Sequence, residues 1–168
     1  PNFKRLSIAD REEEIEFSEP YRFCIFSRVM KEKGIEDAID AIQSINEDAG
    51  RVICSLDIYG RIDDGYAERF EEVLKNVTEA IQYNGMVPYD KSVEAIKDYY
   101  ALLFPTYWDG EGFPGTIVDA FSAGLPVIAT DWNLNAEIIE IKSNCLISAK
   151  KYQPDEYIKK IVNVITES

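Results

Sequence analysis

The sequence predicts an α/β fold with a Rossmann-like parallel sheet and helices on both faces. Short apolar segments typical of buried strands alternate with segments whose apolar residues recur every three or four positions. This alternation is typical of βαβ units, in which the strands run parallel. A chain of 168 residues with 46% hydrophobic and 29% charged residues is long enough for one domain with a sizeable core.

The first half of the chain predicts three strands with a helix after each. The apolar segments cover 21–29, 52–59 and 80–83. Apolar residues recur at helical spacing over Ile35–Ile45 and over Tyr66–Val77, and a shorter helix is expected to begin near Asp90. Residues 1–19 are polar and acidic, so we expect a linker or arm there and a domain over 20–168.

The second half continues the alternation. The predicted strands cover 101–105, 127–130 and 145–147. A helix is expected to begin at Gly115–Thr116 and to end at Gly124, because glycine ends helices well and Pro126 cannot continue one. A small helical turn follows residue 130, and the apolar spacing within 157–165 predicts a closing amphipathic helix.

The segment 109–131 is the most informative part of the chain. It reads as a glycine-rich loop that carries Glu111, a short helix and a buried strand. The start of that helix offers unpaired backbone N–H groups and the positive end of a helix dipole, which suit a phosphate. Thr116, Asp119 and Ser122 fall on one helix face, which suits a phosphorylated, hydroxyl-rich ligand. An ordinary helix with a solvated Asp119 is the alternative.

Topology selects the same region independently. Ligands of open parallel sheets bind beyond the carboxyl ends of the strands. The loops at that edge are predicted to be 27–28, 60–61, 85–88 and 106–116.

Composition excludes several classes of function. The net charge of −13 argues against a nucleic-acid partner, because a phosphate backbone needs a basic surface. The chain has no histidine, which excludes a histidine-based triad or metal site within it. Three cysteines in separate apolar segments indicate reduced, buried thiols and a cytoplasmic protein, and we find no apolar segment long enough to span a membrane.

Several ordered motifs resemble the family-four retaining glycosyltransferases, two-domain enzymes of GT-B architecture. Glu111 and Asp119 match the two acids of the family signature, with Asp119 standing where the family has glutamate. The segment 27–34 resembles the family's arginine–lysine element, 85–87 resembles the loop beside the donor base, and 135–139 resembles the turn after the following strand. The resemblance extends over nearly the whole chain.

The resemblance implies how the donor diphosphate is bound. The planar guanidinium of Arg28 and the ammonium of Lys33 would bind the diphosphate. Gly115 and Thr116 would add backbone N–H groups from the helix start. We therefore expect diphosphate binding without a metal ion or another cofactor.

The resemblance also implies which residues contact the sugar, the ribose and the base of the donor. Glu111 would be the catalytic residue and contact the sugar hydroxyls, Phe113 would line the same part of the site, and Asp119 would bind the ribose. Val87 would border the base. The aromatic pair Tyr107–Trp108 is expected to pack against the neighbouring strand rather than line the sugar site.

The implied function is that of the donor-binding half of a retaining transferase. It would move a sugar from a nucleotide-sugar to a saccharide or lipid-linked acceptor, in polysaccharide or glycoconjugate synthesis. An N-terminal domain of similar fold, absent from this chain, would hold the acceptor and could attach the enzyme peripherally to a membrane, so this part alone is expected to be inactive. A non-catalytic nucleotide-sugar-binding regulatory module is the alternative.

Overall fold

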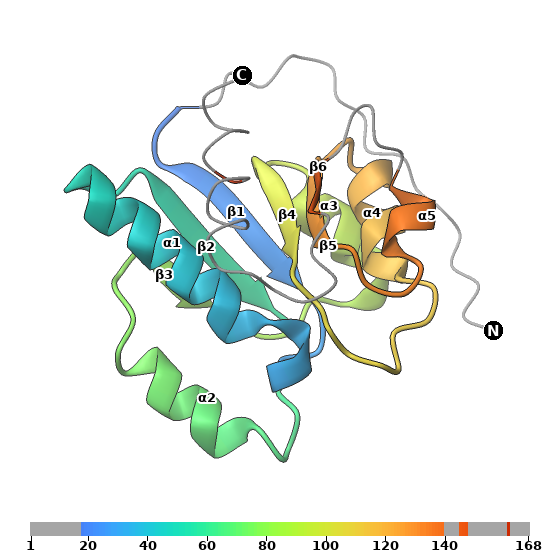
Figure 1. Cartoon of the computed structure of the whole chain (residues 1–168), viewed down its shortest axis with the longest axis horizontal. Helices are drawn as coiled ribbons and strands as arrows, with labels where there is room; N and C mark the ends of the chain where they lie inside the picture. The colour runs from blue at the N-terminus through green and yellow to red at the C-terminus, as the bar shows by residue number, and fades with distance from the viewer. Residues whose placement is uncertain (1–17, 140–144, 148–160, 162–168) are drawn as a thin grey trace.

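The computed structural model describes residues 18–139, 145–147 and 161. Six parallel strands form one sheet in the order β3-β2-β1-β4-β5-β6 (Figure 1). They are β1 (Tyr21–Phe26), β2 (Cys54–Tyr59), β3 (Ile81–Tyr83), β4 (Ala101–Phe104), β5 (Val127–Thr130) and β6 (Cys145–Ile147). The order reverses between β1 and β4, as in Rossmann-type sheets.

Helices cover both faces of the sheet (Figure 1). They are α1 (Ile35–Ala49), α2 (Ala67–Leu74), α3 (Ser92–Ile96), α4 (Gly115–Ser122) and α5 (Asn135–Ile138), with short 3-10 turns η1 (Lys31–Lys33) and η2 (Tyr89–Lys91). Apolar residues of α1 and α2 pack with one set of alternating strand residues, and those of α3 and α4 pack with the other set. The predicted α/β class and sheet are therefore confirmed.

The first strand is shorter than the sequence predicts. It ends at Phe26 rather than Val29, and the chain then leaves the regular ladder. Val29 still pairs with the segment after β2, where its N–H donates to the carbonyl oxygen of Arg61 over 2.8 Å. Val29 faces Ile62 in the same register in which Phe26 faces Tyr59, so the segment after β1 stays beside the segment after β2 at the carboxyl edge of the sheet.

Two predictions lie largely outside the described residues. They are the linker over 1–19 and the closing helix over 157–165, of which Ile161 alone is described and is buried. Among the helices that the structure describes, none has the length and apolar character needed to cross a membrane.

Candidate functional site

A cleft of about 200 Å³ lies where the carboxyl ends of β1 and β4 meet. It is lined by Ser27, Arg28, Met30, Lys33, Phe104, Trp108, Glu111, Phe113, Pro114, Gly115 and Thr116. These residues come from the loops after β1 and β4 and from the start of α4. The cleft therefore occupies the point of strand-order reversal, where ligands of such sheets bind.

Arg28 reaches the cleft from the loop after β1. Its side chain is 56% exposed, and its Nη1 lies 3.8 Å from a carboxylate oxygen of Asp63. An exposed ion pair of this length contributes little to stability. The guanidinium can therefore turn to an anion in the cleft at small cost.

Lys33 and Glu111 form a buried ion pair across the cleft floor. The side chains are 8% and 10% exposed, and the Lys33 ammonium donates directly to Oε2 of Glu111. The same oxygen accepts a hydrogen bond from Thr106 Oγ1 over 2.9 Å. The ammonium also lies 4.6 Å from the centre of the Trp108 ring. In this structure the principal partner of Lys33 is thus Glu111, and its predicted contact with a diphosphate stays a prediction.

The start of α4 also lines the cleft. Pro114 precedes the helix in an extended conformation, and the N–H groups of Gly115 and Thr116 belong to the first turn, which has no intrahelical partners. Thr116 Oγ1 donates to the carbonyl oxygen of Phe26 over 2.8 Å, which fixes α4 to the end of β1. Phe113 is 68% exposed at the rim. Gly115 and Thr116 thus offer backbone donors, while the Thr116 hydroxyl has a structural partner.

Asp119 lies one to two turns further into α4 and does not line the cleft. It is 8% exposed, and its Oδ2 accepts a hydrogen bond of 2.6 Å from Ser92 Oγ at the start of α3. The alternative of an ordinary helix with a solvated Asp119 is therefore wrong. The predicted ribose contact stays a prediction.

Val87 lies in the loop after β3, at the same edge of the sheet. Two hydrogen bonds hold this loop against the loop after β2. The Gly60 N–H donates to the Gly85 carbonyl oxygen, and the Tyr83 hydroxyl donates to the Gly60 carbonyl oxygen, each over 2.8 Å. Val87 is partly buried and lies outside the lining of the cleft. Its predicted contact with the base stays a prediction.

Comparison with protein families identifies the chain. A family model described as glycosyl transferases group 1 matches residues 20–167. The chain belongs to this family. The match includes every loop that lines the cleft. The resemblance to the C-terminal domain of a GT-B glycosyltransferase is confirmed at this level.

Two relatives of known sequence are similar to this group 1 glycosyltransferase. One is an uncharacterized glycosyltransferase of Methanocaldococcus jannaschii, 22% identical over 160 residues that make up 93% of this chain and 39% of the relative. The other is the alpha-galactosylglucosyldiacylglycerol synthase of Streptococcus pneumoniae, 30% identical over 117 residues that make up 67% of this chain and 29% of the relative. The chain thus spans well under half the length of either relative.

Solved structures share the fold of the group 1 chain. HepE from Anabaena, crystallised with UDP-glucose, matches with a TM-score of 0.75 and 18% identity, over 88% of this chain and 39% of HepE. The pneumococcal O-GlcNAc transferase GtfA, crystallised with UDP and GlcNAc, matches with a TM-score of 0.67 and 23% identity, over 89% of this chain and 29% of GtfA. At these identities the likeness concerns the fold.

The glycosyltransferase cleft also uses residues that the sequence did not single out. Thr106 is fully buried and binds the Glu111 carboxylate, while Trp132 and Asn133 donate to the loop that carries Glu111. The Trp108 ring lies over the Lys33 ammonium and lines the cleft. Whether it contacts a sugar is not tested by this contact, so its expected packing role stays a prediction.

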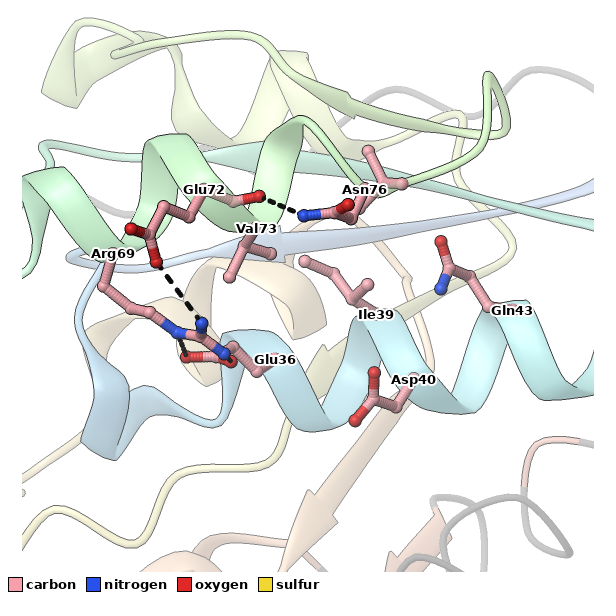
Figure 2. A pocket seen from close by; sticks show the side chains of 9 residues that line it. Glu36, Ile39, Asp40, Gln43, Arg69, Glu72, Val73 and Asn76 are labelled. Atoms are coloured by element: carbon pink, nitrogen blue, oxygen red, sulfur yellow. Dashed lines mark hydrogen bonds and ion pairs between the residues drawn. The ribbon is translucent and has the colours of Figure 1, made fainter.

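A second hollow, of about 150 Å³, separates α1 from α2 (Figure 2). Its lining comprises Glu36, Ile39, Asp40, Gln43, Arg69, Glu72, Val73, Asn76 and Val77. Arg69 is the one cation in this lining, and it binds both Glu36 and Glu72. The Arg69 hydrogen bond holds the pKa of Glu36 below its ordinary value. The hollow therefore suits an anionic nucleotide less well than the cleft does.

Within the described ranges, no three His, Cys, Asp or Glu side chains come together as metal ligands. The cleft instead presents a guanidinium, an ammonium and the start of a helix.

Proposed function

We propose that this chain is the donor-binding domain of a retaining glycosyltransferase and binds a nucleoside diphosphate sugar in the cleft. One observation carries the proposal: Arg28 from the loop after β1 and the N–H groups of Gly115 and Thr116 from α4 line one cleft at the point of strand-order reversal. A guanidinium and a helix start together suit a diphosphate. Because structures of HepE and GtfA contain UDP, UDP is the first probe.

The sugar would lie beside the buried ion pair. Glu111 is the proposed catalytic residue and contacts the sugar hydroxyls, and Phe113 at the rim covers the same region. Lys33 holds the Glu111 carboxylate in place; an ammonium has three donors, so it can also reach a phosphate oxygen. Asp119 of α4 is the proposed ribose ligand, and Val87 in the loop after β3 is the proposed neighbour of the base.

The proposed transfer reaction needs positive groups where negative charge develops on the leaving group. Loss of a nucleoside diphosphate builds negative charge on the leaving phosphate oxygens. The N–H groups at the start of α4 would be fixed donors for that charge, and the exposed Arg28 guanidinium can turn toward it, so both would stabilise the transition state more than the ground state. This arrangement performs the task of a metal ion in other transferases. Transfer with retention at the anomeric carbon is part of the proposal.

The acceptor would bind elsewhere in the whole protein. The chain spans 39% of one relative and 29% of the other, so we propose that a second, N-terminal domain supplies the site for a saccharide or lipid-linked acceptor. Positioning of two reactants accounts for up to roughly 7–11 kcal/mol of a catalysed barrier. A protein made of these 168 residues alone should therefore bind the nucleotide and transfer no sugar above background.

Substitution of Arg28 tests the proposed diphosphate site. Arg28→Ala should weaken UDP binding by roughly 1.5–3 kcal/mol, the range for a charge-assisted hydrogen bond, as measured by titration calorimetry. The melting temperature should hardly change, because the Arg28 side chain is exposed. Arg51→Ala is the matched control, since Arg51 precedes β2 at the opposite edge of the sheet and binds Glu19. Equal UDP affinity in both variants would remove Arg28 from the site.

Substitution of Asp119 tests the proposed ribose contact. Asp119→Asn should weaken UDP binding by about ten-fold, because a carboxylate accepts hydrogen bonds from a vicinal diol more strongly than an amide does. Asp119→Glu should retain part of the affinity. If both variants bind UDP normally and only melt at lower temperature, Asp119 serves the fold through its bond to Ser92.

A further inference from the structure

The carbonyl oxygen of Trp108 accepts hydrogen bonds from three donors. It accepts hydrogen bonds from the Glu111 N–H over 3.0 Å, from Trp132 Nε1 over 2.9 Å and from Asn133 Nδ2 over 3.4 Å. The first bond closes a turn within the loop that carries Glu111. The other two come from the loop between β5 and α5, so that loop is fixed to the turn.

Asn133 makes a second contact with the same turn. Its Nδ2 also donates to the carbonyl oxygen of Glu111 over 3.2 Å, so one amide group bridges the carbonyls of Trp108 and Glu111. Asn133 has a φ of 47° and is the one non-glycine residue at positive φ that the structure describes. Asparagine tolerates this left-handed conformation better than most residues.

Glu111 is thereby held from both ends. Asn133 holds its main chain, and Lys33 and Thr106 hold its carboxylate. The carbonyl oxygen of Thr106 in turn accepts a hydrogen bond of 2.5 Å from Thr130 Oγ1, at the end of β5. The end of β5 and the loop after it therefore fix both the backbone and the side-chain support of Glu111.

We infer that Asn133, assisted by Trp132, is a positioning residue that fixes the turn from Trp108 to Glu111 and so sets where the Glu111 carboxylate lies. The catalytic meaning of this position rests on the proposed function. Asn133 does not itself line the cleft; it binds the main-chain carbonyl oxygens of the lining residues Trp108 and Glu111 and makes no bond to the Glu111 carboxylate. Because catalysis depends steeply on placement, loosening this turn should lower transfer more than nucleotide binding.

Asn133→Gly is the most informative variant. Glycine accepts the left-handed backbone conformation, so the loop can keep its course, and the substitution removes the side chain with its amide donors. Leu134→Ala is the matched control, because Leu134 is the next residue, is 39% exposed and gives no side-chain bond to the turn. Solvent-exchange rates of individual N–H groups, measured by NMR on the ligand-free chain, report the turn directly. The reporters are the Glu111 amide and the Trp132 indole N–H.

Asn133→Gly should raise the exchange rate of the Glu111 amide by about ten-fold or more, with the amides of α1 and β1 unchanged. An unchanged exchange rate of the Glu111 amide overturns the inference. Faster exchange throughout the chain also overturns it, because Asn133 would then stabilise the whole fold rather than this turn. Leu134→Ala should leave the Glu111 amide unaffected.

The same samples separate this inference from the proposed function. UDP affinity should stay within about two-fold of the unmodified chain in Asn133→Gly, because the diphosphate contacts come from Arg28 and α4. If the unmodified chain does not bind UDP, the proposed function fails, while the exchange rates still decide whether Asn133 holds Glu111. In a longer, transfer-competent protein, kcat should fall about ten-fold or more at a nearly constant donor KM.

Discussion

Lys33→Met should lower the free energy of unfolding by about 3–5 kcal/mol, the cost of breaking a buried ion pair by removing one partner. Methionine keeps the length and apolar stem of lysine but leaves the Glu111 carboxylate buried with no ammonium beside it. Among the residues that the structure describes, the Thr106 hydroxyl is then the remaining side-chain donor to that carboxylate. Urea denaturation followed by circular dichroism measures the loss.

A second substitution, at Glu111, tests whether the loss of stability comes from the ion pair with Lys33. Lys33→Met combined with Glu111→Gln should recover most of the lost stability, because a neutral amide at position 111 no longer needs a cation. Lys97→Met is a control for an exposed pair, in which Lys97 Nζ lies 2.7 Å from Glu94 and the Glu94 side chain is 66% exposed. That control should cost less than about 1 kcal/mol. Simple addition of the two single effects at positions 33 and 111 would contradict a coupled pair.

Gly60→Ala should destabilise the chain by more than about 3 kcal/mol or abolish folding, because backbone strain and a backbone clash coincide there. Gly60 has a φ of 141°, and a Cβ built on it lies 1.7 Å from the carbonyl oxygen of Ser27. This atom belongs to the main chain at the edge of the cleft, so relief requires movement of Ser27 and Arg28. Thermal melts and UDP titration should both report the damage.

Gly50→Ala separates the clash from the backbone conformation. Gly50 ends α1 with a φ of 65°, and no other atom lies within 4 Å of a Cβ built there. The left-handed conformation alone costs an L-residue roughly 1–2 kcal/mol. If Gly60→Ala and Gly50→Ala prove equally mild, the close approach of β2 to the loop after β1 does not constrain the cleft.

The sequence predicts most of the fold because its strands are short apolar segments between clear breaks. The strands over 127–130 and 145–147 have the predicted bounds. The first strand differs because its apolar pattern continues to Val29, whereas regular pairing ends at Phe26. An apolar pattern indicates which residues are buried, not which residues belong to a regular strand. Val29 is fully buried, but it pairs with Ile62 in an isolated bridge outside β1.

The cleft could be predicted in outline and its internal pairs could not. The rule that ligands bind at the carboxyl ends of parallel strands selects the loops of Arg28 and Glu111 without knowledge of side-chain contacts. The pairing of Lys33 with Glu111 joins residues 78 positions apart. The bond from Ser92 to Asp119 spans 27 positions. Such pairs depend on how helices and loops pack, which no local spacing reveals.

The position of the bound diphosphate is the central claim, and NMR titration of the isotope-labelled chain with UDP tests it most directly. We predict that the amide resonances of Gly115 and Thr116 and those of the 27–28 loop shift most, while resonances around the hollow between α1 and α2 stay in place. Shifts confined to that hollow, or unchanged spectra at millimolar UDP, would contradict the proposed donor site.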